Sequence, residues 1–338
     1  MTAEEPGPPA PAPPDAGASL MARRPGLARA ARWLSVLAFI GGMGFVVVAF
    51  VDSLGRIEGS AVPNLLPMLA AGGLAAFSQF LAGRAWILLL ERDLDPVAVA
   101  RTWYVSQVGK YVPGGVVQAA GQITLTRRLG VGWAPATIRY VVLAGGFIVA
   151  GLGIGGAVAV LAEDLSPAVR GLVALGAVTP IAMARPLVAL GLRSVRRVWS
   201  RFPSQDHLPG QRQILLSWAA QVGFMLAQAV AFALLFRSLD GDGDLALVIT
   251  SFPLAFAVGT LAVPVPSGLA VREAVLLGVL GPSAGSAVVI AAAVWHRLVT
   301  IVADVAMIGG NELHRRIRRR LASRSDQFEE RPGEDQPA

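Results

Sequence analysis

Long uncharged runs of apolar residues recur along the chain and predict membrane-spanning helices. A helix needs about 20 mostly apolar residues to cross the hydrocarbon core. Six segments approach or reach that length: residues 34–51, 65–83, 141–162, 171–192, 214–236 and 286–310. The fourth of these contains Pro180 and Pro186, so we expect a kinked span there. The last contains Arg297 and Asp304, whose charges need partners or water at that depth.

Two further apolar segments are interrupted by proline and glycine and do not fit as simple spans. Residues 95–128 begin with Asp95 and Pro96, a pair typical of a helix start, and are broken at residues 112–115. Residues 245–281 are broken at residues 263–268. Irregular backbone is tolerated at membrane depth only where it lines a cavity in the protein. We therefore predict two helical hairpins that enter the bilayer and return.

The loop charges predict the orientation of these segments. Arginines gather in four clusters, at residues 23–32, 92–139, 193–212 and 315–320, whereas the other connections carry more acid than base. Positive loops face the cytoplasm, so both termini are expected there, in a multi-pass protein of the cell (cytoplasmic) membrane. The first hairpin then starts and ends in the cytoplasm, and the second starts and ends outside.

The resulting fold class is an all-α polytopic membrane protein, with about six transmembrane helices plus two re-entrant helical hairpins in an inverted repeat. Residues 1–32 are expected to form a disordered, basic cytoplasmic tail. Residues 33–312 form the membrane domain, with repeats of about 33–165 and 166–312. Residues 313–338 form a charged cytoplasmic tail.

Composition excludes several classes of function. Of the 338 residues, 54% are apolar and 15% are charged, which is too few charges to keep such long apolar runs soluble. The chain has no cysteine and three histidines, so thiolate chemistry is excluded and no metal or other cofactor is expected. The net charge of +7 comes from arginines beside the spans, so nucleic acid is not an expected partner. We expect no enzyme activity and no catalytic residue.

Breaks at corresponding positions of two halves point to a transport site. Helix starts just after Pro113 and Pro266 would direct unpaired N–H groups inward, which favours an anionic guest. The predicted lipid headgroup site and translocation path comprise both breaks and the polar residues beside them: Lys110, Pro113, Gly114, Gly115, Gln118, Pro266, Ser267, Gly268, Arg272, Glu273 and Arg297.

Three charged residues at membrane depth carry two further hypotheses. Glu273 is expected to pair with Arg297 and to line the headgroup path; the alternative is an ion pair that only fixes helix register. Asp304 lies two helical turns beyond Arg297, on the same face, and is a candidate for ion coupling. Its alternative role is that of a structural partner for an arginine.

Lys110 is a candidate for collecting a lipid phosphate from the cytoplasmic leaflet. The same role was considered for three nearby arginines: Arg84, Arg101 and Arg127. For all four residues the alternative is a cation whose long stem reaches the membrane interface without a transport role.

Two motif matches are not taken as functional. The glycines from Gly151 to Gly156 match a dinucleotide-binding pattern but lie inside a predicted span, so we interpret them as small residues for close helix packing. Ser267 and His296 suggest an intramembrane serine protease, but Val265 occupies the position where that motif has glycine.

Four stretches of the sequence resemble the lysylphosphatidylglycerol synthase transmembrane-region family, also described as flippase-like membrane proteins. They are Gly83-Arg84-Ala85-Trp86, Gly109-Lys110-Tyr111-Val112-Pro113-Gly114-Gly115-Val116, Pro266-Ser267-Gly268-Leu269-Ala270-Val271-Arg272-Glu273-Ala274 and His296-Arg297-Leu298. The resemblance implies movement of a lipid, or of a lipid-linked headgroup, between leaflets. Many relatives place an acidic residue after the first Pro-Gly-Gly, where this chain has Gln118 and Gln122.

Pattern and resemblance together predict a lipid translocase that moves an anionic phospholipid or a polyprenyl-phosphate-linked headgroup. Relatives also carry a soluble aminoacyl-transferase domain, whereas about 25 residues follow the last predicted span here, so synthase activity is not expected. The alternative is a membrane adaptor for a separate membrane-bound glycosyl- or aminoacyl-transferase. Membrane lipids are the expected partners.

Overall fold

The computed structural model describes residues 62–90, 93–111, 116–161, 184–198, 200, 202–261 and 271–329. Within these residues, four helices are long and apolar enough to cross a membrane: α3 (Leu65–Leu89), α6 (Trp133–Leu161), α9 (Gln211–Ser238) and α12 (Ser286–Glu329). They confirm helices at the predicted spans 65–83, 141–162, 214–236 and 286–310. The predicted span at residues 34–51 lies outside the described residues.

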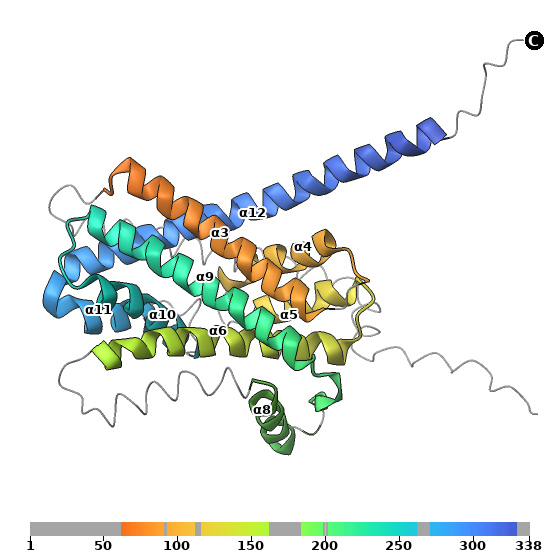
Figure 1. The fold of residues 1–338 in the computed structure, drawn as a ribbon, viewed down its shortest axis with the longest axis horizontal. Helices are drawn as coiled ribbons and strands as arrows, with labels where there is room; N and C mark the ends of the chain where they lie inside the picture. The colour runs from red at the N-terminus through yellow and green to blue at the C-terminus, as the bar shows by residue number, and fades with distance from the viewer. Residues whose placement is uncertain are drawn as a thin grey trace, which may run out of the picture.

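The long helices form a bundle whose outer surface is apolar. α3 packs along α9, α12 crosses both, and α6 lies on the other side of α9 (Figure 1). Large apolar side chains remain exposed on the outer faces of α3 and α12, among them Leu66, Phe77, Val302 and Val305. Soluble proteins rarely leave such a surface uncovered, so the bundle matches a helical protein embedded in lipid.

Glycines of α6 allow a close approach to α10 (Leu245–Leu261). A Cβ atom built on Gly151 would lie 2.8 Å from the Pro253 carbonyl oxygen, and one on Gly155 would lie 2.7 Å from Leu254 Cα. Both distances are too short for any side chain. The structure thus confirms that these glycines serve helix packing.

Five short elements correspond to the two predicted hairpins. The first hairpin comprises α4 (Pro96–Ser106), the 3₁₀ turn η1 (Gln107–Tyr111) and α5 (Val116–Arg127), and the second comprises α10 and α11 (Val271–Ala284). Asp95 caps α4 by accepting a hydrogen bond from the Val97 N–H at 3.2 Å, as predicted from the sequence. In each hairpin the helices before and after the break pack against each other. The break residues, 112–115 and 262–270, lie outside the described residues.

Three basic regions of the chain lie at one end of the bundle. Arg139 near the start of α6 donates from Nε to the Leu89 carbonyl oxygen at the end of α3, at 2.8 Å. Arg318 of α12 forms an ion pair with Asp95 at the start of α4, at 3.1 Å. α9 also begins at this end, and the connection from α9 to α10 lies at the opposite one (Figure 1).

α12 continues well beyond the predicted end of its span at Gly310. Gly309 and Gly310 lie inside the helix, and Glu312 then pairs with Arg315 at 3.1 Å and with Arg316 at 3.7 Å. Pairs at these spacings support an exposed helix. The last turns of α12 project beyond the other helices (Figure 1).

The predicted span at residues 171–192 is only partly described. Its last residues belong to α8 (Ala184–Val198), which continues past the predicted end at Leu192, while residues 171–183 lie outside the described residues. α8 carries apolar residues on one face and Arg193, Arg196 and Arg197 near its end, and it packs against α9 and the short turn η2 (Gln205–His207) outside the bundle (Figure 1). This described part is an amphipathic helix and is too short to cross a bilayer.

Candidate functional site

A cavity of about 550 Å³ lies inside the bundle, where the two hairpins meet. Lys110, Tyr111 and Gln118 line it from the first hairpin, on either side of the break. Leu261 and Arg272 line it from the second hairpin, again on either side of the break. The remaining wall comes from α3, α6, α9 and α12. The structure therefore brings the described residues beside both predicted breaks to one site.

Glu273 and Arg297 form an ion pair in the wall of this cavity. The distance from Arg297 Nη2 to Glu273 Oε1 is 3.1 Å, which confirms the predicted pairing. Both side chains are partly exposed to the cavity, at 24% for Glu273 and 18% for Arg297. The other carboxylate oxygen, Glu273 Oε2, has no hydrogen-bond partner among the described residues. This carboxylate can therefore accept a further hydrogen bond.

Arg272 lies beside this pair but is not part of it. Its guanidinium lies over the Phe256 ring, 4.2 Å from the ring centroid. Its Nε has no hydrogen-bond partner in the described part of the chain. Gly259 makes this position accessible, because a Cβ atom there would lie 2.6 Å from Arg272 Cγ. A cation is thus held against an aromatic face in the cavity wall.

Asp304 is bound by the first hairpin. Its Oδ2 lies 2.6 Å from Lys110 Nζ and accepts a hydrogen bond from the Tyr111 hydroxyl, also at 2.6 Å. The alternative in which an arginine is its structural partner is wrong: lysine and tyrosine occupy that place, because η1 reaches α12 at this point. Asp304 is only 4% exposed, so the contact ties the hairpin to α12.

The charges at the cavity do not cancel. Lys110, Arg272 and Arg297 supply three positive charges, and Glu273 and Asp304 supply two negative ones. The described residues of the site therefore carry one positive charge in excess. In surroundings of low dielectric constant, such an excess favours an anionic guest.

The other predicted residues divide into three groups. Gln118 lines the cavity and donates from Nε2 to Gln107 Oε1 at 3.3 Å. Arg101 pairs with Glu312 at 3.5 Å, and neither it nor Arg84 nor Arg127 is part of the described lining. Six predicted residues lie outside the described residues: Pro113, Gly114, Gly115, Pro266, Ser267 and Gly268.

Sequence reasoning did not assign to the headgroup site five buried polar side chains that line the same cavity: Gln79, Trp103, Gln107, Gln228 and His296. The available signal was an amide inside an otherwise uncharged run, as at residues 79 and 228. Amides inside long uncharged helices were not among the predicted residues, because the prediction was limited to the two breaks and to the charged or polar residues near them. The rings of Phe252 and His296 lie 4.4 Å apart between centroids, which places the imidazole among aromatic side chains.

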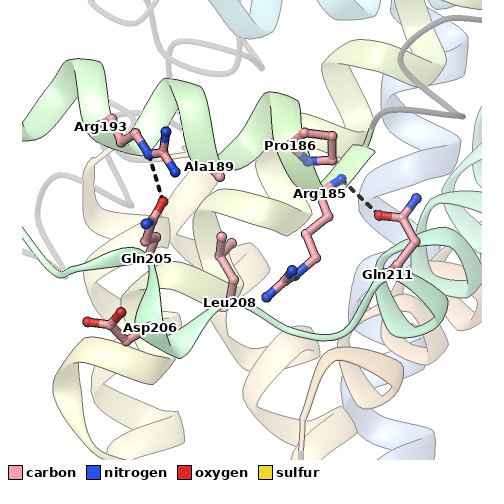
Figure 2. A pocket seen from close by; sticks show the side chains of 8 residues that line it. All are labelled: Arg185, Pro186, Ala189, Arg193, Gln205, Asp206, Leu208 and Gln211. Atoms are coloured by element: carbon pink, nitrogen blue, oxygen red, sulfur yellow. Dashed lines mark hydrogen bonds between the residues drawn. The ribbon is translucent and has the colours of Figure 1, made fainter.

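A second cavity, of about 560 Å³, lies outside the bundle between α8, η2 and the start of α9 (Figure 2). Arg193 Nε donates to Gln205 Oε1 at 2.9 Å, and the Arg185 backbone N–H donates to Gln211 Oε1 at 3.1 Å. These bonds join α8 to the segment leading into α9. They explain the position of α8, and the cavity contains none of the predicted headgroup residues.

Comparison of the sequence with known proteins identifies its family. No curated protein was found to match the chain. A family model described as lysylphosphatidylglycerol synthase TM region matches residues 32–307. The matched segment contains both hairpins and every residue of the inner cavity named above. The chain therefore belongs to the lysylphosphatidylglycerol synthase transmembrane-region family, as its sequence motifs indicated.

Proposed function

We propose that this protein moves an anionic phospholipid, or a polyprenyl-phosphate-linked headgroup, between the leaflets of the cell membrane. The observation that supports the proposal is the inner cavity, which combines excess positive charge with walls made by helices of membrane-spanning length. A lipid phosphate needs such a polar passage because hydrocarbon does not solvate its charge. Family membership independently supports a lipid-related function.

In this proposal the two hairpins are re-entrant and belong to an inverted repeat. Supporting this arrangement, each hairpin consists of short helices that pack together, and both hairpins contribute residues to the same cavity. Hairpins that enter from opposite sides would give a headgroup access to one site from either leaflet. The acyl or prenyl tails would stay in the surrounding lipid.

The proposed orientation has both termini in the cytoplasm. The first hairpin, the start of α9 and the projecting part of α12 carry many of the described arginines and lie toward one end of the bundle (Figure 1). A bundle with basic loops at one end has that end in the cytoplasm according to the positive-inside rule.

The charged side chains of the cavity wall suggest how a headgroup binds and leaves. Arg272 attracts the phosphate, and the Glu273–Arg297 ion pair then weakens as these two side chains form contacts with the headgroup. No covalent bond is made or broken, so the proposal requires no catalytic group. Asp304 remains the predicted ion-coupling residue, should transport be driven by an ion gradient.

Leaflet exchange in liposomes tests the proposal. The purified protein is reconstituted with fluorescent phosphatidylglycerol, and dithionite is added to bleach only the outer leaflet. We expect bleaching beyond the outer-leaflet fraction in liposomes that contain the protein. Arg272→Gln should slow exchange by about 10- to 150-fold, since the loss of a charge-assisted contact costs about 1.5 to 3 kcal/mol.

Arg196→Gln is the matched control, because Arg196 is exposed on α8 and lies outside the described lining of the cavity. Exchange by this variant should equal that of the unaltered protein. The proposal fails if liposomes with and without the protein bleach to the same extent, or if Arg272→Gln retains the full rate.

The adaptor alternative is favoured by one feature, the charged part of α12 that projects from the bundle (Figure 1). An adaptor would use this helix to recruit a separate membrane-bound transferase. In cells, loss of transferase recruitment on truncation of α12 after Glu312 would favour the adaptor. A transferase that works normally while cavity variants abolish lipid exchange would favour the translocase.

A further inference from the structure

We infer that the inner cavity selects a phosphate attached to an uncharged, hydroxyl-rich ring, such as a sugar or cyclic polyol, over an aminoacylated headgroup. This inference rests on the proposed function, because it names the class of lipid that the same cavity would take. Three independent features of the cavity carry it: its unpaired polar atoms, its aromatic wall and its charge.

The first feature is a set of buried polar atoms without hydrogen-bond partners among the described residues. Besides Arg272 Nε and Glu273 Oε2, described above, the set has four members: Gln79 Oε1, Gln228 Oε1, Trp103 Nε1 and His296 Nε2. All four side chains line the cavity and are at most 5% exposed. Unpaired buried polar groups are rare and costly, so such a group calls for a ligand or water that completes it.

The chemical types of these atoms specify the ligand. The amide oxygens accept, the indole N–H donates, and the imidazole nitrogen does either, depending on its tautomer. A phosphate offers only acceptors, and an ammonium group offers only donors. A hydroxyl group is both donor and acceptor, so neighbouring hydroxyls on one ring satisfy the whole mixed set.

The second feature is an aromatic wall in the same cavity. Trp103 stacks on Phe147 with ring centroids 5.8 Å apart, and Phe147 lies 6.1 Å from Phe256, the ring under Arg272. All three rings line the cavity. A sugar or polyol ring has an apolar C–H face that packs on aromatic rings while its hydroxyl edge meets polar side chains. The cation over Phe256 places the phosphate beside that ring.

The third feature is the excess positive charge, which acts against an aminoacylated lipid. A lysyl ester of phosphatidylglycerol carries two ammonium groups and one phosphate, so its headgroup is a net cation. Both carboxylates of the site already hold a cation, Glu273 with Arg297 and Asp304 with Lys110. Glu273 Oε2 can still accept one hydrogen bond, but the described site already carries a positive charge in excess. A cationic headgroup would add to that excess beside Arg272, and like charges repel strongly where water is scarce.

Lipid binding to the full-length protein tests the inference separately from transport. Native mass spectrometry of the detergent-solubilised protein would compare three lipids with identical acyl chains: phosphatidylinositol, phosphatidic acid and lysylphosphatidylglycerol. We expect phosphatidylinositol to bind at least about tenfold more tightly than either of the others, which corresponds to two or so additional hydrogen bonds. The difference in affinity between phosphatidylinositol and phosphatidic acid measures the contribution of the ring hydroxyls. The difference between phosphatidylinositol and lysylphosphatidylglycerol measures the effect of the positive headgroup charge.

Gln79→Met and Gln228→Met remove the amides while nearly preserving side-chain shape, and should reduce this preference by about fivefold each. Gln221→Met is the matched control, since Gln221 is a buried glutamine of the same helix α9 that is not in the cavity lining. It should leave the preference unchanged. Elution as a single species in size-exclusion chromatography would establish that each variant is folded.

The outcomes separate this inference from the proposed function. Equal binding of all three lipids, or tighter binding of lysylphosphatidylglycerol, overturns the headgroup assignment even if lipid exchange is observed. Preferential binding of phosphatidylinositol without any exchange supports the assignment and overturns the translocase. Soluble inositol phosphate that binds as tightly as the lipid would overturn the lipid as the source of the headgroup.

Discussion

The contact between Lys110 and Asp304 gives the sharpest quantitative prediction. Lys110 ends the first half of one hairpin, Asp304 lies on α12, and Tyr111 shares the same carboxylate oxygen. Lys110→Met removes the charge while keeping most of the apolar stem, and Asp304→Asn removes the opposite charge at nearly constant volume. The double variant removes both charges at once.

The expected magnitude follows from distance and burial. At 2.6 Å and an effective dielectric constant of about 20, the attraction between the two charges is roughly 6 kcal/mol, and desolvation offsets much of it. Because Asp304 is 4% exposed, either single variant leaves a poorly solvated charge, at a cost of about 3 kcal/mol. The double variant should lose about 4 kcal/mol, rather than the roughly 6 kcal/mol expected of independent changes.

Thermal unfolding of the purified protein measures this coupling. Each single variant should lower the apparent melting temperature by roughly 6 °C, and the double variant by clearly less than the sum. Tyr111→Phe should cost about 2 kcal/mol, since it removes a single hydrogen bond to a charged group. Strictly additive losses in the double variant would refute the idea that this ion pair links the first hairpin to α12.

Two further predictions address helix packing and orientation. Gly155→Ala should destabilise the protein by about 1 to 3 kcal/mol, because its Cβ would lie 2.7 Å from Leu254 Cα. Gly145→Ala is the control and should be nearly neutral, because a Cβ atom there meets nothing within 4 Å. Equal stabilities of the two variants in thermal unfolding would argue against the close α6–α10 contact. The chain has no cysteine, so His207→Cys and Asp242→Cys each create a unique labelling site. Membrane-impermeant maleimide should label residue 242 in intact cells and residue 207 only after permeabilisation, and the reverse pattern would contradict the proposed orientation.

The candidate site was predicted in part, and the successes share one cause. Glu273 and Arg297 were paired correctly because an ion in an apolar segment needs a partner of opposite charge, and few such residues exist there. The partner of Asp304 was predicted as an arginine, but Lys110 and Tyr111 occupy that place. Sequence alone did not indicate that the end of the first hairpin reaches α12, because the contact depends on how two segments far apart in the chain are arranged.

Hydropathy and charge are local properties, and they determined the element types by themselves. The length of each apolar run set the positions of α3, α6, α9 and α12, because hydrocarbon requires every backbone polar group to be paired within a helix. The glycine spacing in α6 likewise predicted close packing, because a helix face made of glycines lets a second helix approach closely. The end of α12 was not determined in this way, because a charged helix in water is supported by pairs such as Glu312 with Arg315.

Only the tertiary structure decided which polar groups share one cavity. Gln79, Gln228 and His296 come from three different helices, and the directions of their side chains depend on how those helices rotate against each other. The rotation of each helix about its own axis is fixed by many side-chain contacts with neighbouring helices. No single segment of the sequence encodes those contacts. The sequence therefore determined that the chain forms apolar helices, and the packing of those helices determined which side chains share the cavity.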